Sequence, residues 1–322
     1  MICYVPAETA TGELRAALTP TTAKALTDLG LQVQTDPGVG HASHYADADY
    51  TVAGATLVTD PAAALASADV VLRVRKPSPE AIAALKPGAI HLSFLDPFNE
   101  TSLLEAFAAA QASAVSLEMI PRTTLAQKMD ALSSQASLAG YAAVVQAAAR
   151  VRSALPMMMT PAGTLMPCRV FVIGAGVAGL QAIATAKRLG ARVEAFDTRP
   201  VVEEQVKSLG AKFVKIDLGE TGQTAGGYAK QLTPEQVAKQ QAGMAKICGL
   251  SDIVITTAKV FGRKAPRIIS AAMLAGMKPG SVVVDMAVES GGNVEGAIAG
   301  EDVVTDNGVT ILGHPSLECT TA

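Results

Sequence analysis

Residues 169 to 180 read RVFVIGAGVAGL, in which a short run of strand-forming residues leads into the pattern Gly-x-Gly-x-x-Gly. Gly174 allows a tight turn, Gly176 lets the backbone approach a phosphate, and Gly179 lets a helix pack closely on the strand. The next apolar segment, residues 180 to 189, has helical spacing, and the free N–H groups at its start would face an anion. This order of strand, turn and helix predicts a binding site for the pyrophosphate of a dinucleotide.

An acidic residue at the expected distance supports this prediction. The following apolar strand, residues 192 to 196, leads to Asp197, eighteen residues after Gly179. A carboxylate there can accept hydrogen bonds from the diol of an adenine ribose. Arg199 could instead bind the 2′-phosphate of NADP, but Asp197 would repel that phosphate, so NAD(H) is favoured. The competing interpretation is a glycine-rich turn without a ligand, and the adjoining strand, helix and acid make it the weaker one.

The composition excludes several classes of protein. The 322 residues suggest about two domains, and 49% hydrophobic against 17% charged residues allow a large core. A net charge of −3, no basic block and 4% aromatic residues argue against nucleic-acid binding. The four cysteines are far apart, and His41 and His44 have no third ligand nearby, so neither a disulfide framework nor a metal site is predicted. Neither a signal peptide nor an apolar run of spanning length is expected, so we expect a soluble chain.

Strand-like and helix-like segments alternate along the chain, which predicts an α/β protein with parallel sheets. We expect two doubly wound, Rossmann-like domains with a cleft between them. The expected divisions are a first domain at residues 1–129, a long interdomain helix and linker at 130–167, a dinucleotide-binding domain at 168–302, and a C-terminal segment at 303–322 that could return to the first domain.

Three further segments carry candidate site residues. Thr257 and Ala258 follow a predicted strand, at the edge where ligands of open α/β sheets bind. Residues 217–232 contain four glycines and Tyr228, which is typical of a functional or disordered loop. Residues 119–135 place Arg, Gln, Asp and Ser on a loop and a first helical turn, where they could face the cleft. Helix capping by Asp130 beside solvated polar residues explains that last pattern equally well.

At these segments the sequence resembles the NAD(H)-binding domain of proton-translocating NAD(P) transhydrogenase, called domain I or the alpha subunit. The resemblance covers nearly the whole chain, and no other family fits the stretches in this order. The matching stretches are residues 121–122, 126–127, 130–135, 139–141, 156–160, 174–187, 196–200, 226–230, 265–266, 277–281 and 291–293.

The resemblance implies a role for each region of the site. Nicotinamide and its ribose would be held by Arg122, Gln127 and Asp130, with Ser133 nearby. The pyrophosphate would be lined by Gly174, Gly176, Val177, Ala178 and Gly179. The adenosine ribose would be bound at Asp197, Thr198 and Arg199. Thr257 and Ala258 would lie beside the cofactor, and a mobile loop with Gly227 and Tyr228 would close over it.

The resemblance also implies the partners. The cofactor is NAD(H), and hydride passes to NADP+ on an NADP(H)-binding domain or beta subunit, coupled to proton translocation by a membrane-spanning domain. We expect a homodimer that sits as a peripheral component on the cytoplasmic side of the inner membrane, or on a mitochondrial matrix side. Family members usually continue past Gly313 with a long helix, and this chain does not, which bears on dimerisation and domain closure.

The chemistry agrees with this division of roles. Hydride transfer between two nicotinamides requires two rings at near-contact distance with water excluded, and it requires no acid, base or nucleophile. Amide and carboxylate groups that hold a carboxamide and a ribose are sufficient. Our hypothesis is that Gln127 bridges the ring to the incoming NADP(H) domain, while Arg122 and Asp130 pair and shape the loop.

Two other functions share these features. Alanine dehydrogenase has the same fold and nucleotide turn, and Arg15 stands where its substrate arginine would be. However, Arg75 and Asp96 stand where that family has its catalytic lysine and its acid/base histidine, so two of three essential groups differ. The third possibility is a non-catalytic NAD-binding sensor or assembly module.

Overall fold

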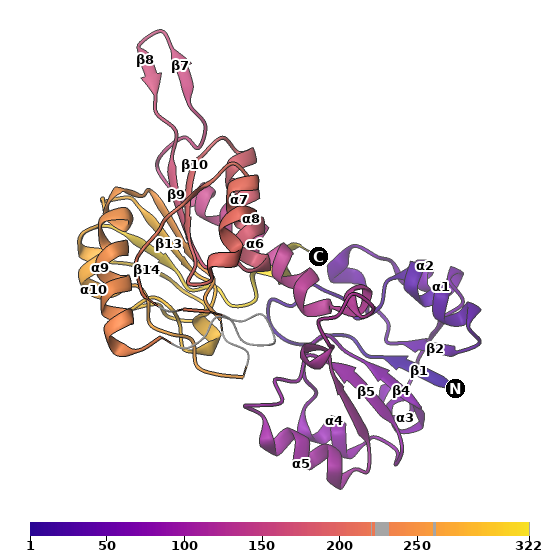
Figure 1. Cartoon of the computed structure of the whole chain (residues 1–322). Coiled ribbons are helices and arrows are strands. Elements are labelled where there is room, and N and C mark those ends of the chain that lie inside the picture. Colours follow the sequence, from indigo (N-terminus) through magenta and orange to yellow (C-terminus); the bar gives the residue numbers. More distant parts are fainter. Residues whose placement is uncertain (220, 223–231, 260–261, 322) are drawn as a thin grey trace. The chain divides into compact units, whose positions relative to one another are not determined.

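The computed structural model describes residues 1–219, 221–222, 232–259 and 262–321 (Figure 1). These residues form two compact units, each with its own sheet. Unit 1 comprises Met1–Leu132 together with Cys319–Ala322, and unit 2 comprises Ser133–Glu318. We describe the two units separately.

Unit 1 is built on a six-stranded sheet in which every described pairing is parallel. Its strand order is β3-β2-β1-β4-β5-β6. The strands are β1 (Ile2–Val5), β2 (Gln32–Thr35), β3 (Thr56–Leu57), β4 (Val70–Leu72), β5 (Ile90–Ser93) and β6 (Ser113–Ser116). The helices are α1 (Pro20–Asp28), α2 (Asp47–Val52), α3 (Pro61–Ser67), α4 (Pro79–Ala83) and α5 (Thr101–Ala109).

Unit 2 is built on a seven-stranded sheet with the order β11-β10-β9-β12-β13-β15-β14, in which only β14 is antiparallel to its neighbour. The strands are β9 (Arg169–Ile173), β10 (Arg192–Phe196), β11 (Lys212–Phe213), β12 (Ile253–Thr256), β13 (Val282–Asp285), β14 (Asp302–Val304) and β15 (Thr310–Leu312). The helices are α6 (Ala131–Arg150), α7 (Val177–Arg188), α8 (Glu203–Ser208), α9 (Pro234–Leu250) and α10 (Ala271–Ala275).

Both faces of each sheet are covered, as expected for parallel strands that read as continuous apolar runs. Along β9, Val170 and Val172 belong to one buried apolar cluster, whereas Phe171 and Ile173 belong to another. Along β1, Tyr4 belongs to one buried apolar cluster, whereas Cys3 and Val5 belong to another. The predicted fold class, with its doubly wound parallel sheets, is therefore confirmed.

Local sequence explains where many helices begin. Four of them start with a capping side chain followed by a proline, which removes one N–H group that the helix could not satisfy and sets φ in advance. The pairs are Thr19-Pro20, Asp60-Pro61, Ser78-Pro79 and Thr233-Pro234. In α1 and α9 the residue at N3 also bonds back to the cap, which completes a capping box.

Both sheets reverse their strand order beside their first strand. In unit 1 the chain moves from β1 to β2 and β3, and then returns to place β4 on the other side of β1. In unit 2 it moves from β9 to β10 and β11, and then places β12 on the other side of β9. Ligands of open α/β sheets bind in the crevice at such a reversal, outside the carboxyl ends of the strands. Each unit therefore has one such position.

Three segments differ from the sequence prediction. Residues 156–167, expected to be a plain linker, contain the hairpin β7 (Met158–Thr160) and β8 (Gly163–Leu165), which extends away from the sheet of unit 2 (Figure 1). The sheet of unit 2 continues past residue 302, because β15 pairs with β13 and β14 with β15. Strand β11 covers only two residues of the expected 212–216. Short edge strands and hairpins lack the long apolar runs by which strands are recognised.

Candidate nucleotide-binding site

The turn between β9 and α7 has the geometry that its glycines suggest. Gly174 has a φ of 98°, a left-handed conformation that other residues rarely adopt. The hydroxyl of Thr257 donates to the carbonyl oxygen of Gly174 at 3.0 Å and holds the turn against the end of β12. A Cβ added at Gly179 would lie 1.9 Å from that same carbonyl oxygen. Glycine at position 179 therefore allows α7 to lie against the turn.

Gly176 differs from the other two glycines because it faces open space. A Cβ added there would meet a single atom within 4 Å in the described structure, Nη2 of Arg199 at 4.0 Å. Gly176 is also the N-cap residue of α7 and has no side chain with which to cap the first turn. The N–H groups at the start of α7 thus border an unfilled space, and these features fit the pyrophosphate of a dinucleotide. Val177 is 42% exposed and Ala178 is partly exposed at this edge.

Asp197, directly after β10, is bonded to the same turn. Its carboxylate accepts the backbone N–H of Ala175 at 2.7 Å, and its side chain is only 5% exposed. A carboxylate has about four lone-pair positions, and Ala175 and Arg199 together fill them, so a ribose diol would bind Asp197 by displacing a hydrogen bond from Arg199. The carboxylate therefore fixes the shape of the turn and borders the position predicted for the adenosine ribose.

Arg199 binds Asp197 through a two-pronged ion pair. Its Nε donates to Oδ1 at 2.9 Å, its Nη2 donates to Oδ2 at 2.8 Å, and its backbone N–H also donates to Oδ1. The hydrogen bonds that the Arg199 guanidinium donates to Asp197 raise its pKa. Since Asp197 neutralises this guanidinium, Arg199 is a poor partner for a 2′-phosphate, and the pairing favours NAD(H) over NADP(H). The carbonyl of Thr198, between them, accepts the hydroxyl of Thr221.

Two residues support this edge in ways that sequence reasoning missed. The buried amide of Asn293 donates to the carbonyl oxygens of Ala258 and Pro266 at 2.9 and 2.8 Å, which fixes the loop after β12. Gly140 of α6 lies against the start of α7, because a Cβ added there would be 2.2 Å from the carbonyl oxygen of Ala178. For Gly140, the sequence did offer a signal, because a glycine inside an alanine-rich helix usually has a packing or functional reason.

The residues predicted to hold nicotinamide lie on a separate, exposed segment. Arg122 and Gln127 are exposed and Asp130 is partly buried, and all three belong to unit 1. Ser133, in the first turn of α6, belongs to unit 2. Gly227 and Tyr228 lie outside the described residues. The joint role of these residues at the cofactor stays a prediction.

Arg15 and Arg75, the two arginines compared above with alanine dehydrogenase, belong to an internal ion-pair cluster in unit 1. Buried Glu13 accepts Nε of Arg15 at 2.7 Å and Nε of Arg75 at 2.6 Å. Nη2 of Arg75 also lies 3.2 Å from the Sγ of Cys319, whose thiol pKa is raised to about 11 by burial. Both arginines are thus engaged with groups of the protein itself. The carboxylate of Asp96 accepts two hydrogen bonds from the side-chain amide of Asn99.

The pKa of Glu13 reflects its hydrogen bonds and ion pairs in this cluster. Burial alone would raise it, but the hydrogen bonds and charge of Arg15 outweigh burial and lower the pKa to about 2. The carboxylate is therefore fully ionised at neutral pH and holds both arginines. Both guanidinium groups are therefore held by an internal carboxylate in this structure.

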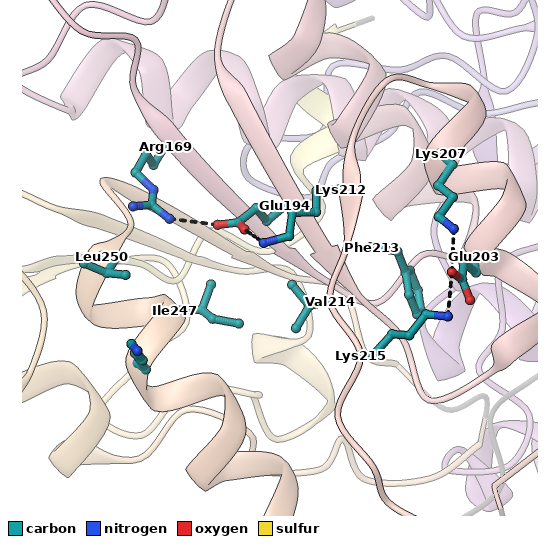
Figure 2. A pocket seen from close by; sticks show the side chains of 11 residues that line it. Arg169, Glu194, Glu203, Lys207, Lys212, Phe213, Val214, Lys215, Ile247 and Leu250 are labelled. Carbon is teal, nitrogen blue, oxygen red and sulfur yellow. Dashed lines mark hydrogen bonds and ion pairs between the residues drawn. The ribbon is translucent and has the colours of Figure 1, made fainter.

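A different hollow of about 460 Å³ in unit 2 is lined by five cations and two carboxylates (Figure 2). Each carboxylate is shared by two cations: Glu194 binds Arg169 and Lys212, and Glu203 binds two lysines. Arg169 begins β9, at the end of the strand opposite Gly174. This hollow is therefore separate from the nucleotide crevice. No group of His, Cys, Asp and Glu residues suited to a metal ion occurs in the described regions of the chain.

Comparison with known proteins identifies the family. The alanine dehydrogenase/PNT N-terminal domain matches residues 4–139, and the C-terminal domain of the same family matches residues 143–322. An NAD(P) transhydrogenase alpha subunit of Rhodospirillum rubrum is 44% identical over 320 residues, which cover 97% of this chain and 83% of that one. The longer NAD(P) transhydrogenase alpha subunit of Cereibacter sphaeroides is 42% identical over 96% of this chain and 60% of its own length.

Solved structures give the same order of similarity. The transhydrogenase from Sinorhizobium meliloti superposes with a TM-score of 0.89 at 44% identity, over all of this chain and 89% of that one. An L-alanine dehydrogenase superposes with a TM-score of 0.80 at 24% identity, which shows the shared fold. The family resemblance inferred from the motifs is confirmed. The chain belongs to the alanine dehydrogenase/PNT family, on the branch of the NAD(P) transhydrogenase alpha subunits.

Proposed function

We propose that this chain is the NAD(H)-binding component of a proton-translocating NAD(P) transhydrogenase. The observation that carries the proposal is the nucleotide turn at Gly174–Gly179 with its Asp197 carboxylate, in a chain 44% identical to a transhydrogenase alpha subunit over 97% of its length. Hydride would pass between NAD(H) on this chain and NADP(H) on a partner domain or beta subunit. A membrane-spanning domain would couple the transfer to proton movement. In the described stretches of this chain, no helix is long and apolar enough to cross a membrane.

Bound NAD(H) supplies the hydride, and the tasks of the protein are to bind, orient and exclude water. The N–H groups at the start of α7 would face the pyrophosphate, and Asp197 would lie at the adenosine ribose. Thr257 and Asn293 keep the neighbouring loops in place through the carbonyls of Gly174 and Ala258. Arg122, Gln127 and Asp130 would position the nicotinamide end.

The segment around Gln127 has the character of a docking surface. Leu125 is 91% exposed, and Met119 and Met129 are 52% and 58% exposed, beside the polar Arg122 and Gln127. Apolar side chains grouped with amide and guanidinium groups are typical of protein interfaces. We assign this surface to the NADP(H)-binding partner, because hydride transfer requires the two nicotinamides to meet there.

The hairpin β7–β8 supports the proposal of a homodimer. Its five large apolar side chains are 47–85% exposed, and they are Met157, Met158, Met159, Leu165 and Met166. A two-stranded hairpin is marginal alone in water, and methionine adapts well to interfaces. We assign a second copy of the chain as the partner that covers it. Replacing Met159 and Met166 by Ser should raise the monomer fraction in sedimentation, whereas the same change at exposed Val52 should not.

The activity is tested by mixing the chain with an NADP(H)-binding partner and following hydride transfer between nucleotide analogues. We expect transfer by the wild type, loss of transfer in Gln127→Ala, and retention in Gln32→Ala, a matched change at an exposed residue of β2. If hydride transfer is unchanged in Gln127→Ala, the proposed role of Gln127 in the transfer is wrong. Nucleotide binding without any transfer would indicate a non-catalytic NAD module, and NADH oxidation with pyruvate and ammonia by the chain alone would indicate an alanine dehydrogenase.

A further inference from the structure

Unit 1 contains a cavity of about 610 Å³ at the reversal of its own strand order. The loops that line it leave the carboxyl ends of β1, β2 and β4, and α3 and the first residues of α4 complete the wall. This is the position in unit 1 that corresponds to the NAD(H) crevice of unit 2. Its volume lies in the range of small-molecule sites. The family comparison assigns no ligand to it.

A carboxylate occupies the same place in both crevices. Asp36 directly follows β2, the second strand of its sheet, and it accepts the backbone N–H of Ala7 at 3.0 Å. Asp197 directly follows β10, the second strand of the other sheet, and it accepts the N–H of Ala175 at 2.7 Å. Ala7 and Ala175 each stand two residues after the first strand ends. Asp36 is therefore the counterpart of the predicted ribose-binding acid.

A cation whose Nε makes no hydrogen bond lines the same cavity, and its charge acts on the carboxylate of Glu8 in the same lining. Arg73 follows β4, and its Nε is buried with no hydrogen-bond partner. Within the described residues no ion pair joins its side chain to a carboxylate. The other two cations of the lining are engaged, Arg75 with Glu13 and Lys76 with Glu100. Arg73 is thus the one lining cation available to an anionic ligand group, such as a phosphate.

The turn after β1 limits how large an anionic group this crevice can bind. It begins with Pro6, which has no N–H group, and Glu8, whose carboxylate accepts the N–H of Val74 at 2.6 Å. Helix α1 begins only at Pro20, so no helix start follows the strand as α7 follows β9. The glycine turn and N–H groups that bind a pyrophosphate are absent from this crevice. One phosphate at Arg73 can be held, and a dinucleotide cannot.

We propose that this crevice of unit 1 binds a nucleoside 5′-monophosphate. Asp36 would accept the ribose diol, Arg73 would bind the phosphate, and the base would lie against the apolar wall of Pro61, Ala62 and Leu65. Tyr4, whose hydroxyl donates to Asp36 at 2.5 Å, keeps the carboxylate turned towards the cavity edge. The site is separate from the NAD(H) crevice and does not depend on the proposed hydride transfer.

The test is calorimetric titration of AMP into the full chain saturated with NADH, so that the crevice of unit 2 is filled. We expect one AMP per chain, with affinity at least tenfold lower in Arg73→Gln and in Asp36→Asn. Arg188→Gln, at an exposed arginine of α7, should bind AMP as the wild type does. Adenosine and inorganic phosphate, titrated separately, should each bind more weakly than AMP.

Thermal melting and NADH fluorescence check that each variant is folded and still binds NADH. If Arg73→Gln does not fold, the test uses Asp36→Asn and Arg73→Lys instead. Arg73→Lys preserves the charge and should therefore still bind AMP. The proposal fails if AMP binding vanishes as NADH saturates, since AMP would then occupy only unit 2. It also fails if the folded Arg73 and Asp36 variants bind AMP as Arg188→Gln does.

Discussion

The two crevices of this protein share a topology and an acid but differ in the turn that follows the first strand. In unit 2 that turn is Gly-Ala-Gly and leads directly into α7. In unit 1 it is Pro-Ala-Glu, and fourteen residues separate the end of β1 from α1. The alanine that bonds the acid is the residue they have in common. The sheet thus provides a position for a ligand, and the turn determines how much negative charge that position can hold.

The same contrast appears in how the two units use buried charge. In unit 1, Glu13 lies between Arg15 and Arg75 and is 0% exposed. In unit 2, Asp197 is tied to Arg199, but its other bond goes to the nucleotide turn. The first cluster joins two arginines of unit 1 through one carboxylate, whereas the second holds the nucleotide turn. In unit 1 the buried ion pairs thus join residues of the protein to each other, whereas in unit 2 the ion pair fixes the turn that is predicted to bind the nucleotide.

The largest effect should come from Glu13→Gln. Removing this charge leaves Arg15 and Arg75 without their shared carboxylate, and breaking a buried ion pair costs about 3–5 kcal/mol. Urea unfolding measures the loss. Glu203→Gln is the matched control, because its carboxylate is also shared by two cations but they are exposed lysines. Equal unfolding midpoints for the two variants would contradict a structural role for the Glu13 cluster.

Acid should weaken the same cluster. The pKa of Glu13 is lowered from 4.5 to about 2 in the folded state, so its contribution is complete above pH 4.5 and is lost as pH falls towards 2. The stability difference between wild type and Glu13→Gln should therefore shrink by on the order of 3 kcal/mol across this window. Urea unfolding of both proteins at intervals of pH tests this. A difference that stays constant from pH 5 to pH 3 would exclude the assigned ion pair.

Two alanine substitutions should separate folding from binding in unit 2. Gly179→Ala places a Cβ 1.9 Å from a backbone carbonyl oxygen, so we expect about 1–3 kcal/mol of destabilisation and weaker NADH binding. Gly176→Ala meets no atom closer than 4.0 Å, so stability should be preserved while the methyl group obstructs the pyrophosphate. Thermal melting and NADH fluorescence distinguish the two. If Gly176→Ala binds NADH with wild-type affinity, the prediction that the pyrophosphate binds at this turn is wrong.

The smallest effect on nucleotide binding should come from Asp197→Asn, which also breaks a buried ion pair and should lower the midpoint of thermal melting. A hydrogen bond to a charged group contributes about 1.5 kcal/mol, so NADH affinity should fall about tenfold. The substitution also releases Arg199 from a carboxylate, which should narrow the preference for NADH over NADPH. Asp306→Asn, at an exposed acid of the same unit, serves as the control. Unchanged affinities for both nucleotides would mean that Asp197 only shapes the turn.

Much of the fold was predictable because its signals are local. Apolar runs marked the strands of both sheets, and capping residues followed by prolines marked helix starts such as Thr19-Pro20. Strands β14 and β15 and the hairpin β7–β8 were missed, since segments of three residues carry no periodic pattern. The roles of Asn293 and Gly140 were missed as well, because each depends on a carbonyl group that belongs to another element.

The sequence by itself determined the nucleotide turn, its acid and the family, because a strand, three glycines and a carboxylate at short spacing act through neighbouring backbone. Only the tertiary structure decided that Asp197 is paired with Arg199, and that Asp36 repeats its arrangement in the other unit. It alone also brought Cys319 to Glu13, 306 residues earlier in the chain. Contacts of that kind arise when sheets and turns bring distant residues together, and no local spacing records them.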